Sequence, residues 1–278
     1  MMTSQMLISM NFWNRKSDDP LLKIFLEKYG LHLLSIPRED SNVGDLYIQD
    51  PNIKYLSTAG SIRHFLVPKF EVSDLDITVD ELMADVVGKV SKDVSGNAGL
   101  NFLENFLNNL AMSNIGAKIT GSYEGTNKNA ITFTFANPRR DSLDPLLLGN
   151  RIFKYKFDKS NALYSEDRKF FIVTAIAKSS SITVDFLGDK KNSLDLDIDV
   201  LKFADGKGGF KVESSKSGSF TFKGDKNLVF GVELYELVYD KLNKKIKMNM
   251  LGGAMSPRGA EQESPNVSKE DVFIEIRD

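Results

Sequence analysis

Alternation of apolar and polar residues in the second half of the chain constrains the fold more than any other feature. It is strictest at residues 194–200 and recurs at residues 131–135 and 181–186. Because successive side chains of a β-strand point to opposite faces, this pattern predicts strands with one buried and one polar face. The continuous apolar run 170–177 has the length of a fully buried strand.

Further strands are expected at residues 210–213, 219–222 and 228–239, because glycine-containing turn signals separate them. One of these signals is Gly224-Asp225, which predicts a chain reversal between the last two segments.

The first half of the chain carries signals for helices as well as strands. Asp19-Pro20 predicts a helix start and Gly30 its end, followed by a strand at residues 31–36 that Pro37 closes. Short strands are expected at 47–48, 65–67 and 74–79, whereas the apolar spacing over residues 80–115 predicts two amphipathic helices. The predicted fold class is α+β: a single domain with a twisted, mainly antiparallel β-sheet and surrounding helices.

The C-terminal residues predict a strand that follows a flexible linker. Residues 252–265 contain three glycines and two prolines with almost no apolar side chains, a composition that cannot offset the entropy of ordering. A strand with Val272, Ile274 and Ile276 on one face follows, and Phe273 is a possible second anchor. We therefore expect an N-terminal extension (1–16), a folded body (17–247), a cleavable linker (248–265) and a docking peptide (266–278).

Composition excludes several classes of protein. The sequence has no cysteine, so disulfides, thiolate metal sites and S-acylation are absent. The formal net charge of −2 gives no nucleic-acid signature. No apolar run reaches the length of a transmembrane helix, and the N-terminus does not resemble a secretion signal, so a cytoplasmic protein is expected.

No group of residues predicts catalysis or a cofactor. Asp195, Asp197 and Asp199 share one face of a predicted strand. A solvated face fits them better than a calcium site because the glycine and distal glutamate of a calcium loop are missing, and such a strand could also line a water-filled barrel wall. The two histidines, His32 and His64, lie in apolar segments with no triad pattern.

Two basic clusters and one aromatic pair leave alternatives open. Arg139-Arg140 and the lysines at positions 241, 244, 245 and 247 could meet lipid headgroups or be ordinary surface charge. Phe12 and Trp13 could pack into a groove or anchor at a membrane interface.

Several segments resemble the bacterial gasdermin family, in the same order, across residues 18–245. The segments that carry the resemblance are Asp19-Pro20-Leu21-Leu22-Lys23 with Tyr29-Gly30, Leu34-Ser35-Ile36-Pro37-Arg38, Ile131-Thr132-Phe133-Thr134-Phe135, Arg140-Asp141-Ser142-Leu143-Asp144-Pro145-Leu146 with Leu148-Gly149, residues 171–184, and residues 228–233 with Tyr239-Asp240.

The resemblance implies a non-enzymatic, pore-forming effector of antiviral defence. In that family a short C-terminal peptide blocks assembly, a partner protease removes it, and the released body oligomerises into a large membrane β-barrel that kills the phage-infected cell. The expected partners are an activating protease, anionic or neutral lipids of the inner membrane, and further copies of the chain. The alternative, from another functional class, is a soluble lipid- or peptide-binding module whose C-terminal strand controls access to a groove.

The resemblance also leads to expectations about the cleavage site and the lipid anchor. Cleavage is expected at Leu251-Gly252, or as a second choice at Arg258-Gly259, and docking through Val272, Phe273, Ile274 and Ile276. Members of the family typically carry a palmitoylated N-terminal cysteine, which this chain lacks. We expect Phe12 and Trp13 to fill part of that role.

Overall fold

The computed structural model describes residues 20–51, 53, 55–70, 77–91, 130–187, 211–215, 219–250 and 276–277. Its helical elements are α1 (Pro20–Tyr29), the short 3-10 helix η1 (Ile62–His64) and α4 (Pro145–Ile152). Its strands are β1 (His32–Arg38), β2 (Asp45–Gln49), β3 (Leu56–Ser61), β4 (Leu66–Val67), β5 (Ile77–Leu82), β6 (Val86–Ser91), β7 (Ala130–Phe135), β8 (Arg139–Leu143), β9 (Lys156–Phe157), β10 (Lys169–Leu187), β11 (Lys211–Ser215), β12 (Ser219–Asp240), β13 (Lys245–Met250) and β14 (Ile276–Arg277).

A large sheet organises the described residues, and its central path runs β1-β12-β10-β2-β3-β14. All of its pairings among these residues are antiparallel except the one between β14 and β3. Side branches attach β8 and β5 to one part of β10, and β7 and β6 to another. The mainly antiparallel fold predicted from alternation is therefore confirmed.

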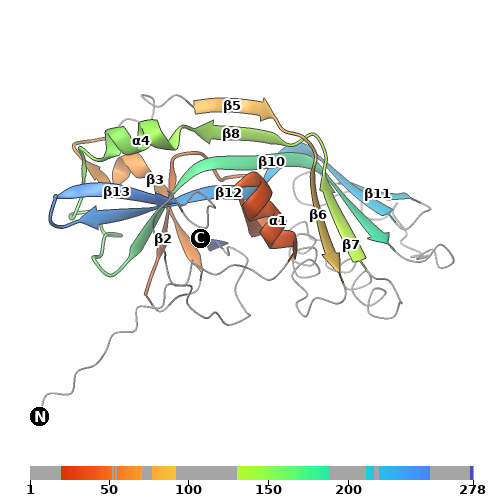
Figure 1. Cartoon of the computed structure of the whole chain (residues 1–278), viewed down its shortest axis with the longest axis horizontal. Coiled ribbons are helices and arrows are strands. Elements are labelled where there is room, and N and C mark those ends of the chain that lie inside the picture. Colours follow the sequence, from red (N-terminus) through yellow and green to blue (C-terminus); the bar gives the residue numbers. More distant parts are fainter. Residues whose placement is uncertain are drawn as a thin grey trace, which may run out of the picture.

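Two long strands, β10 with 19 residues and β12 with 22 residues, run along the length of the molecule (Figure 1). They pair with each other from Phe170 opposite Leu237 to Asp185 opposite Ser219. The sequence predicted β10 as two strands and β12 as two strands joined by a reversal at Gly224-Asp225, and that reversal is wrong. Residues 224–227 instead form an irregular bulge opposite Ser180, between the pairs Ser179–Leu228 and Ser181–Lys223.

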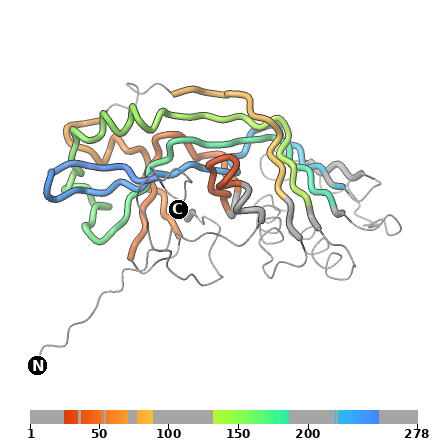
Figure 2. The backbone as a smooth tube through the Cα atoms, viewed as in Figure 1, coloured from red at the N-terminus to blue at the C-terminus, as the bar shows by residue number. Residues whose placement is uncertain are grey.

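This bulge divides the long strands into a body and an arm. On the body side, β10 pairs with β2 and β8, whereas on the arm side it pairs with β7. The tube in Figure 2 shows β6, β7 and β10 bending downward together at this point. The Ser179 hydroxyl accepts a hydrogen bond from the Ser181 backbone N–H (3.0 Å) and donates to the Ala136 carbonyl (2.9 Å), so its hydrogen bonds support the bend.

Both faces of the body bury apolar side chains, because neighbouring residues of one strand point to opposite sides. Phe170 and Ile172 belong to a core cluster covered by α4, whereas Phe171 and Val173 belong to a second cluster on the other face. A bulge between Val173 and Ala175 shifts the alternation by one residue.

Helix α1 begins and ends where its sequence signals place it. Gly30 follows its last residue with a φ of +66°, a conformation that glycine adopts without strain. Phe25 packs edge-on against Phe135 and Phe230, which stack on each other with ring centroids 3.9 Å apart. Helix α1 thus covers the sheet where β7 and β12 approach the bend.

The prediction of an amphipathic helix at the start of residues 80–115 is wrong. Residues 80–91 belong to β5 and β6 with a short connection between them. Leu82 and Val86 fit a helical spacing, but pairing with β8 and β7 makes the segment extended. The second expected helix lies outside the described residues.

Candidate functional site

The C-terminal strand β14 docks on an edge of the sheet. It pairs in parallel with β3, with Ile276 opposite Leu56 and Arg277 opposite Ser57. It also lies close to β1, the strand at the other end of the central path. The path therefore curls until β14 approaches β1, and β14 occupies the seam between β3 and β1.

The seam borders one of the two buried clusters. Leu34 on β1 and Leu56 on β3 both belong to the cluster that contains Phe171 and Val173. Leu34 and Leu56 are at most 1% exposed in the full chain. An added strand at this seam is the arrangement that peptide recognition by β-augmentation uses, in which backbone hydrogen bonds supply the attachment.

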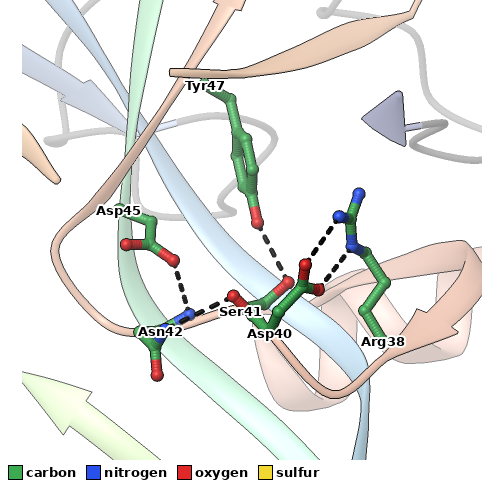
Figure 3. A network of polar contacts seen from close by, with 6 residues as sticks. All are labelled: Arg38, Asp40, Ser41, Asn42, Asp45 and Tyr47. Atoms are coloured by element: carbon green, nitrogen blue, oxygen red, sulfur yellow. Dashed lines mark hydrogen bonds and ion pairs between the residues drawn. The ribbon is translucent and has the colours of Figure 1, made fainter. Parts of the chain in front are cut away.

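Hydrogen bonds and an ion pair connect the residues of the loop between β1 and β2 beside this seam (Figure 3). Arg38 binds both carboxylate oxygens of Asp40 at 2.9 and 3.0 Å, and its hydrogen bonds hold the pKa of Asp40 below its usual value. The Asn42 backbone N–H donates to Asp45 at 2.7 Å. Burial raises the pKa of the Asp45 carboxyl, and the hydrogen bonds from Asn42 oppose that shift.

Tyr47 joins this network to the core. Its ring is 1% exposed and its hydroxyl donates to the Ser41 hydroxyl at 3.1 Å. Burial raises the pKa of Tyr47 to about 12, so the hydroxyl stays protonated near neutral pH. Since β2 lies between β10 and β3, the network fixes the strand that supports the docking edge.

Two charge contacts cross the body on the side of β8. Arg140 on β8 binds Glu233 on β12 at 2.8 Å, spanning β10 between them. Burial raises the pKa of Glu233, and the positive charge of Arg140 partly opposes this rise. The two side chains meet because the β10 residues opposite them, Ala177 and Ala175, are small.

The second contact holds the outer strand β5. Lys178 on β10 lies 2.8 Å from Asp80 and 2.7 Å from Asp141. Asp80 sits in a one-residue bulge of β5 with a φ of +56°, and its backbone N–H donates to Asp141. The bulge and these charges interrupt the regular hydrogen-bonding pattern of an edge strand, which disfavours pairing with another chain.

Comparison with known proteins decides the family. The model of the Bacterial Gasdermin Family matches residues 34–245, which is most of the chain. The chain belongs to the bacterial gasdermin family. Membership supports the role of a pore-forming effector and agrees with the absence of a predicted catalytic centre.

Individual bacterial gasdermins are similar over most of their length. Gasdermin bGSDM of Vitiosangium sp. is 28% identical over 229 residues, covering 79% of this chain and 81% of that protein. Gasdermin bGSDM of Lysobacter enzymogenes is 24% identical over 255 residues, covering 89% and 92%. The structure of a bacterial gasdermin from Bradyrhizobium tropiciagri matches with a TM-score of 0.62 at 18% identity, covering 95% and 98%. This last match shows a common fold.

Most residues predicted to matter for activation lie outside the described part of this gasdermin. These are Phe12, Trp13, Leu251, Gly252, Arg258, Gly259, Val272, Phe273 and Ile274. Ile276 is placed by its backbone pairing with Leu56. The acidic residues Asp195, Asp197 and Asp199 are also outside, and the described residues contain no group of acidic or histidine side chains able to hold a metal. No helix among them is long and apolar enough to span a membrane.

The two basic clusters differ in their surroundings. Arg140 is engaged with Glu233, and Arg139 donates to the Asp80 carbonyl at 3.3 Å, so this cluster is tied into the sheet. The lysines of the second cluster lie in or beside the turn between β12 and β13 and are exposed. Sequence reasoning missed the docking strand β3 and the strand β8 that carries the arginines, because both are rich in small or polar residues.

Proposed function

We propose that this gasdermin is the autoinhibited precursor of a membrane pore, held inactive in the cytoplasm by its C-terminal strand. Proteolytic removal of that strand releases the body to oligomerise into a β-barrel in the inner membrane and kill the phage-infected cell. The observation that carries the proposal is the seam: β14 occupies the edge of β3 beside β1 in a chain of a pore-forming family.

The long strands support the membrane part of the proposal. A transmembrane β-strand needs about 9–11 residues, and β10 and β12 have 19 and 22. Because irregular backbone is excluded from lipid, strands that span a membrane must close into a barrel. The irregular bulge at residues 224–227 offers chain length that extends β12 during refolding.

The proposed cleavage position lies beyond the last strand of the body. β13 ends at Met250, one residue before Leu251. Cleavage at Leu251-Gly252 would separate β14 from the body and leave the strands of the sheet intact, and cleavage at Arg258-Gly259 is the second choice. Mass spectrometry of the chain after exposure to the activating protease distinguishes the two positions.

The test is a dye-leakage assay with the full chain carrying a site for a sequence-specific protease between Gly252 and Arg258. We expect no leakage from anionic vesicles before cleavage and rapid leakage after it. The matched control is the unaltered chain treated with the same protease. Equal leakage with and without cleavage, or none in either state, contradicts autoinhibition; a stable monomer after cleavage favours the binding-module alternative.

The N-terminal aromatic pair is proposed to replace part of the missing lipid anchor. Alanine at both Phe12 and Trp13 is then expected to reduce leakage by the cleaved chain. Unchanged leakage together with unchanged thermal stability of the intact chain would remove this role.

A further inference from the structure

The outer edge of β5 and β6 has no partner strand among the residues that the structure describes. β5 pairs with β8 and β6 pairs with β7, so each is the last strand of its branch of the sheet (Figure 1). An edge of this kind presents unpaired N–H and C=O groups to which a strand of another chain can add. β11 forms a second such edge, since it pairs with β12 alone within the described part of the chain.

β5 and β6 share one register along their partners β8 and β7. From Leu82 opposite Arg139 to Val86 opposite Phe135, both chains advance by four residues. No residue is therefore inserted on either side of the connection, and residues 81–91 have the register of one continuous strand.

One residue at the start of β5 lies outside this register. The pairs Thr78–Ser142 and Glu81–Arg140 are three residues apart on β5 but two residues apart on β8. The extra residue gives the bulge at Asp80, whose φ of +56° is a conformation that residues other than glycine adopt infrequently. The bulge places the start of β5 one position out of step with the rest of the strand.

Contacts to the backbone of Asp80 hold this bulge. The Asp80 N–H donates to the Asp141 carboxylate at 2.8 Å, and the Arg139 guanidinium donates to the Asp80 carbonyl at 3.3 Å. The Asp80 carboxylate also lies 2.8 Å from the Lys178 ammonium group, but its side chain is 61% exposed, so this ion pair adds little to the bulge itself. Because the two backbone contacts do not use the side chain, the bulge depends mainly on whether the residue at this position tolerates a positive φ.

A second copy of the chain is the partner that fits these edges. Each copy presents one edge at β5 and β6 and another at β11, so unlike surfaces of two copies meet. Contacts between unlike surfaces of identical chains repeat from copy to copy and form a ring when the rotation closes, which is the assembly that the proposed function requires. Val79, Leu82 and Val87 are 62%, 64% and 42% exposed on β5 and β6, so a strand added here also covers apolar surface.

We propose that the Asp80 bulge slows assembly by keeping the outer edge of β5 irregular, and that its removal gives one continuous strand, residues 77–91, which pairs with a strand of a second copy. The bulge is removed when residue 80 leaves the left-handed region and residues 77–79 move by one position along β8. This inference rests on the proposed function, because it concerns the assembly that follows cleavage. The tail controls whether assembly starts, and the bulge controls how fast it proceeds.

Two substitutions at position 80 separate backbone conformation from charge. Asp80→Val places a β-branched residue where φ is positive, which shifts the equilibrium toward the extended backbone by about tenfold. Asp80→Gly also removes the carboxylate but keeps the left-handed region accessible. After cleavage at the engineered protease site, we expect Asp80→Val to self-associate at about one-tenth of the usual protein concentration and to begin leakage earlier, and Asp80→Gly to behave as the unaltered chain does.

Glu81→Val is the matched control for Asp80→Val. It exchanges a carboxylate for the same side chain at the next position of β5, where φ is not positive. Sedimentation velocity without vesicles measures self-association, dye leakage measures pore formation, and thermal melting confirms that each variant folds. The inference is overturned if Asp80→Val has no effect, or if Glu81→Val or Asp80→Gly has the same effect.

Two engineered disulfides test the register directly, because the chain contains no other cysteine. Opposite residues of antiparallel strands have Cα atoms about 4.5–5.5 Å apart, a separation that a disulfide bridges. Thr78→Cys with Ser142→Cys fixes the bulged register, whereas Val87→Cys with Thr134→Cys fixes a pair whose register the proposal leaves unchanged. We expect the first disulfide to prevent leakage by the cleaved chain until it is reduced, and the second to permit leakage. Leakage with the first disulfide intact, or an equal block by both, contradicts the inference.

Self-association and leakage together separate this inference from the proposed function. If the cleaved unaltered chain causes leakage but neither Asp80→Val nor the first disulfide changes it, pore formation stands and the bulge has no role. If Asp80→Val self-associates more readily than Glu81→Val but no cleaved chain causes leakage, the role of the bulge stands and the pore-forming proposal fails.

Discussion

The contact between Arg140 and Glu233 offers a sharp test of the energetics inside the sheet. The Glu233 side chain is 11% exposed and that of Arg140 28% exposed. The Glu233 carboxylate has therefore lost most of its hydration, and the Arg140 guanidinium compensates for that loss. Arg140→Met removes the guanidinium that stabilises the Glu233 carboxylate and keeps much of the aliphatic part of the side chain. Breaking a buried ion pair on one side costs about 3–5 kcal/mol; because Arg140 reaches solvent, we expect a loss of about 2–4 kcal/mol near pH 8.

The loss is expected to depend on pH. Burial already raises the pKa of Glu233 in the folded chain, and removal of Arg140 raises it further. A carboxyl whose pKa is higher in the folded than in the unfolded state contributes stability that is complete below the unfolded pKa and is lost as pH rises through the folded pKa. The variant should therefore recover at least about 1 kcal/mol relative to the unaltered chain between about pH 8 and about pH 5.

Urea denaturation at both pH values measures these differences from the midpoints and slopes. The double variant with Arg140→Met and Glu233→Gln should lie within about 1 kcal/mol of the unaltered chain, because no charge remains buried. Lys159→Met, which breaks the exposed pair with Glu166, serves as the control and should be unchanged within error. An equal loss for Arg140→Met at both pH values, or a double variant as unstable as the single one, refutes the reasoning.

Three further changes test other parts of the fold. Tyr47→Phe leaves the Ser41 hydroxyl without its donor and should cost about 0.5–1.5 kcal/mol in urea denaturation. Asp144→Ala removes the cap that accepts from the first backbone N–H groups of α4 and should cost about 1 kcal/mol, with Asp144→Ser recovering most of it. Lys178→Met leaves Asp141, which is 14% exposed, without its cation and should increase hydrogen exchange in β5 more than in β2.

Elements with local signals could be predicted from the sequence. Helix α1 has proline at its start and a glycine with positive φ after its end, and both act within a few residues of the boundary. The core strand β10 has long apolar and alternating stretches, which indicate a strand whatever its partners are. Its continuity across Ser180 was not predictable, because a bulge depends on the opposite strand.

Elements whose conformation depends on distant partners were either not predicted or predicted wrongly. β3, with the sequence LSTAGS, has one large apolar residue and becomes a strand by pairing with β2. β8 contains two arginines for which the sequence left lipid headgroups and ordinary surface charge as alternatives, and pairing with β10 places them in the sheet. Helix α4 was missed although Asp144 and Pro145 form an ordinary cap and first helical position.

The covalent connection between β14 and the body has a consequence for how a cut could act. Among the described residues, Ile276 and Arg277 pair with β3, and backbone hydrogen bonds of this kind contribute about 0.5–1.5 kcal/mol each. While the tail remains covalently joined to the body, its effective concentration at the seam is about millimolar, as for a flexible linker. On the proposed function, cleavage needs to break no contact at the seam: it turns an intramolecular equilibrium into a bimolecular one, and dilution removes the strand.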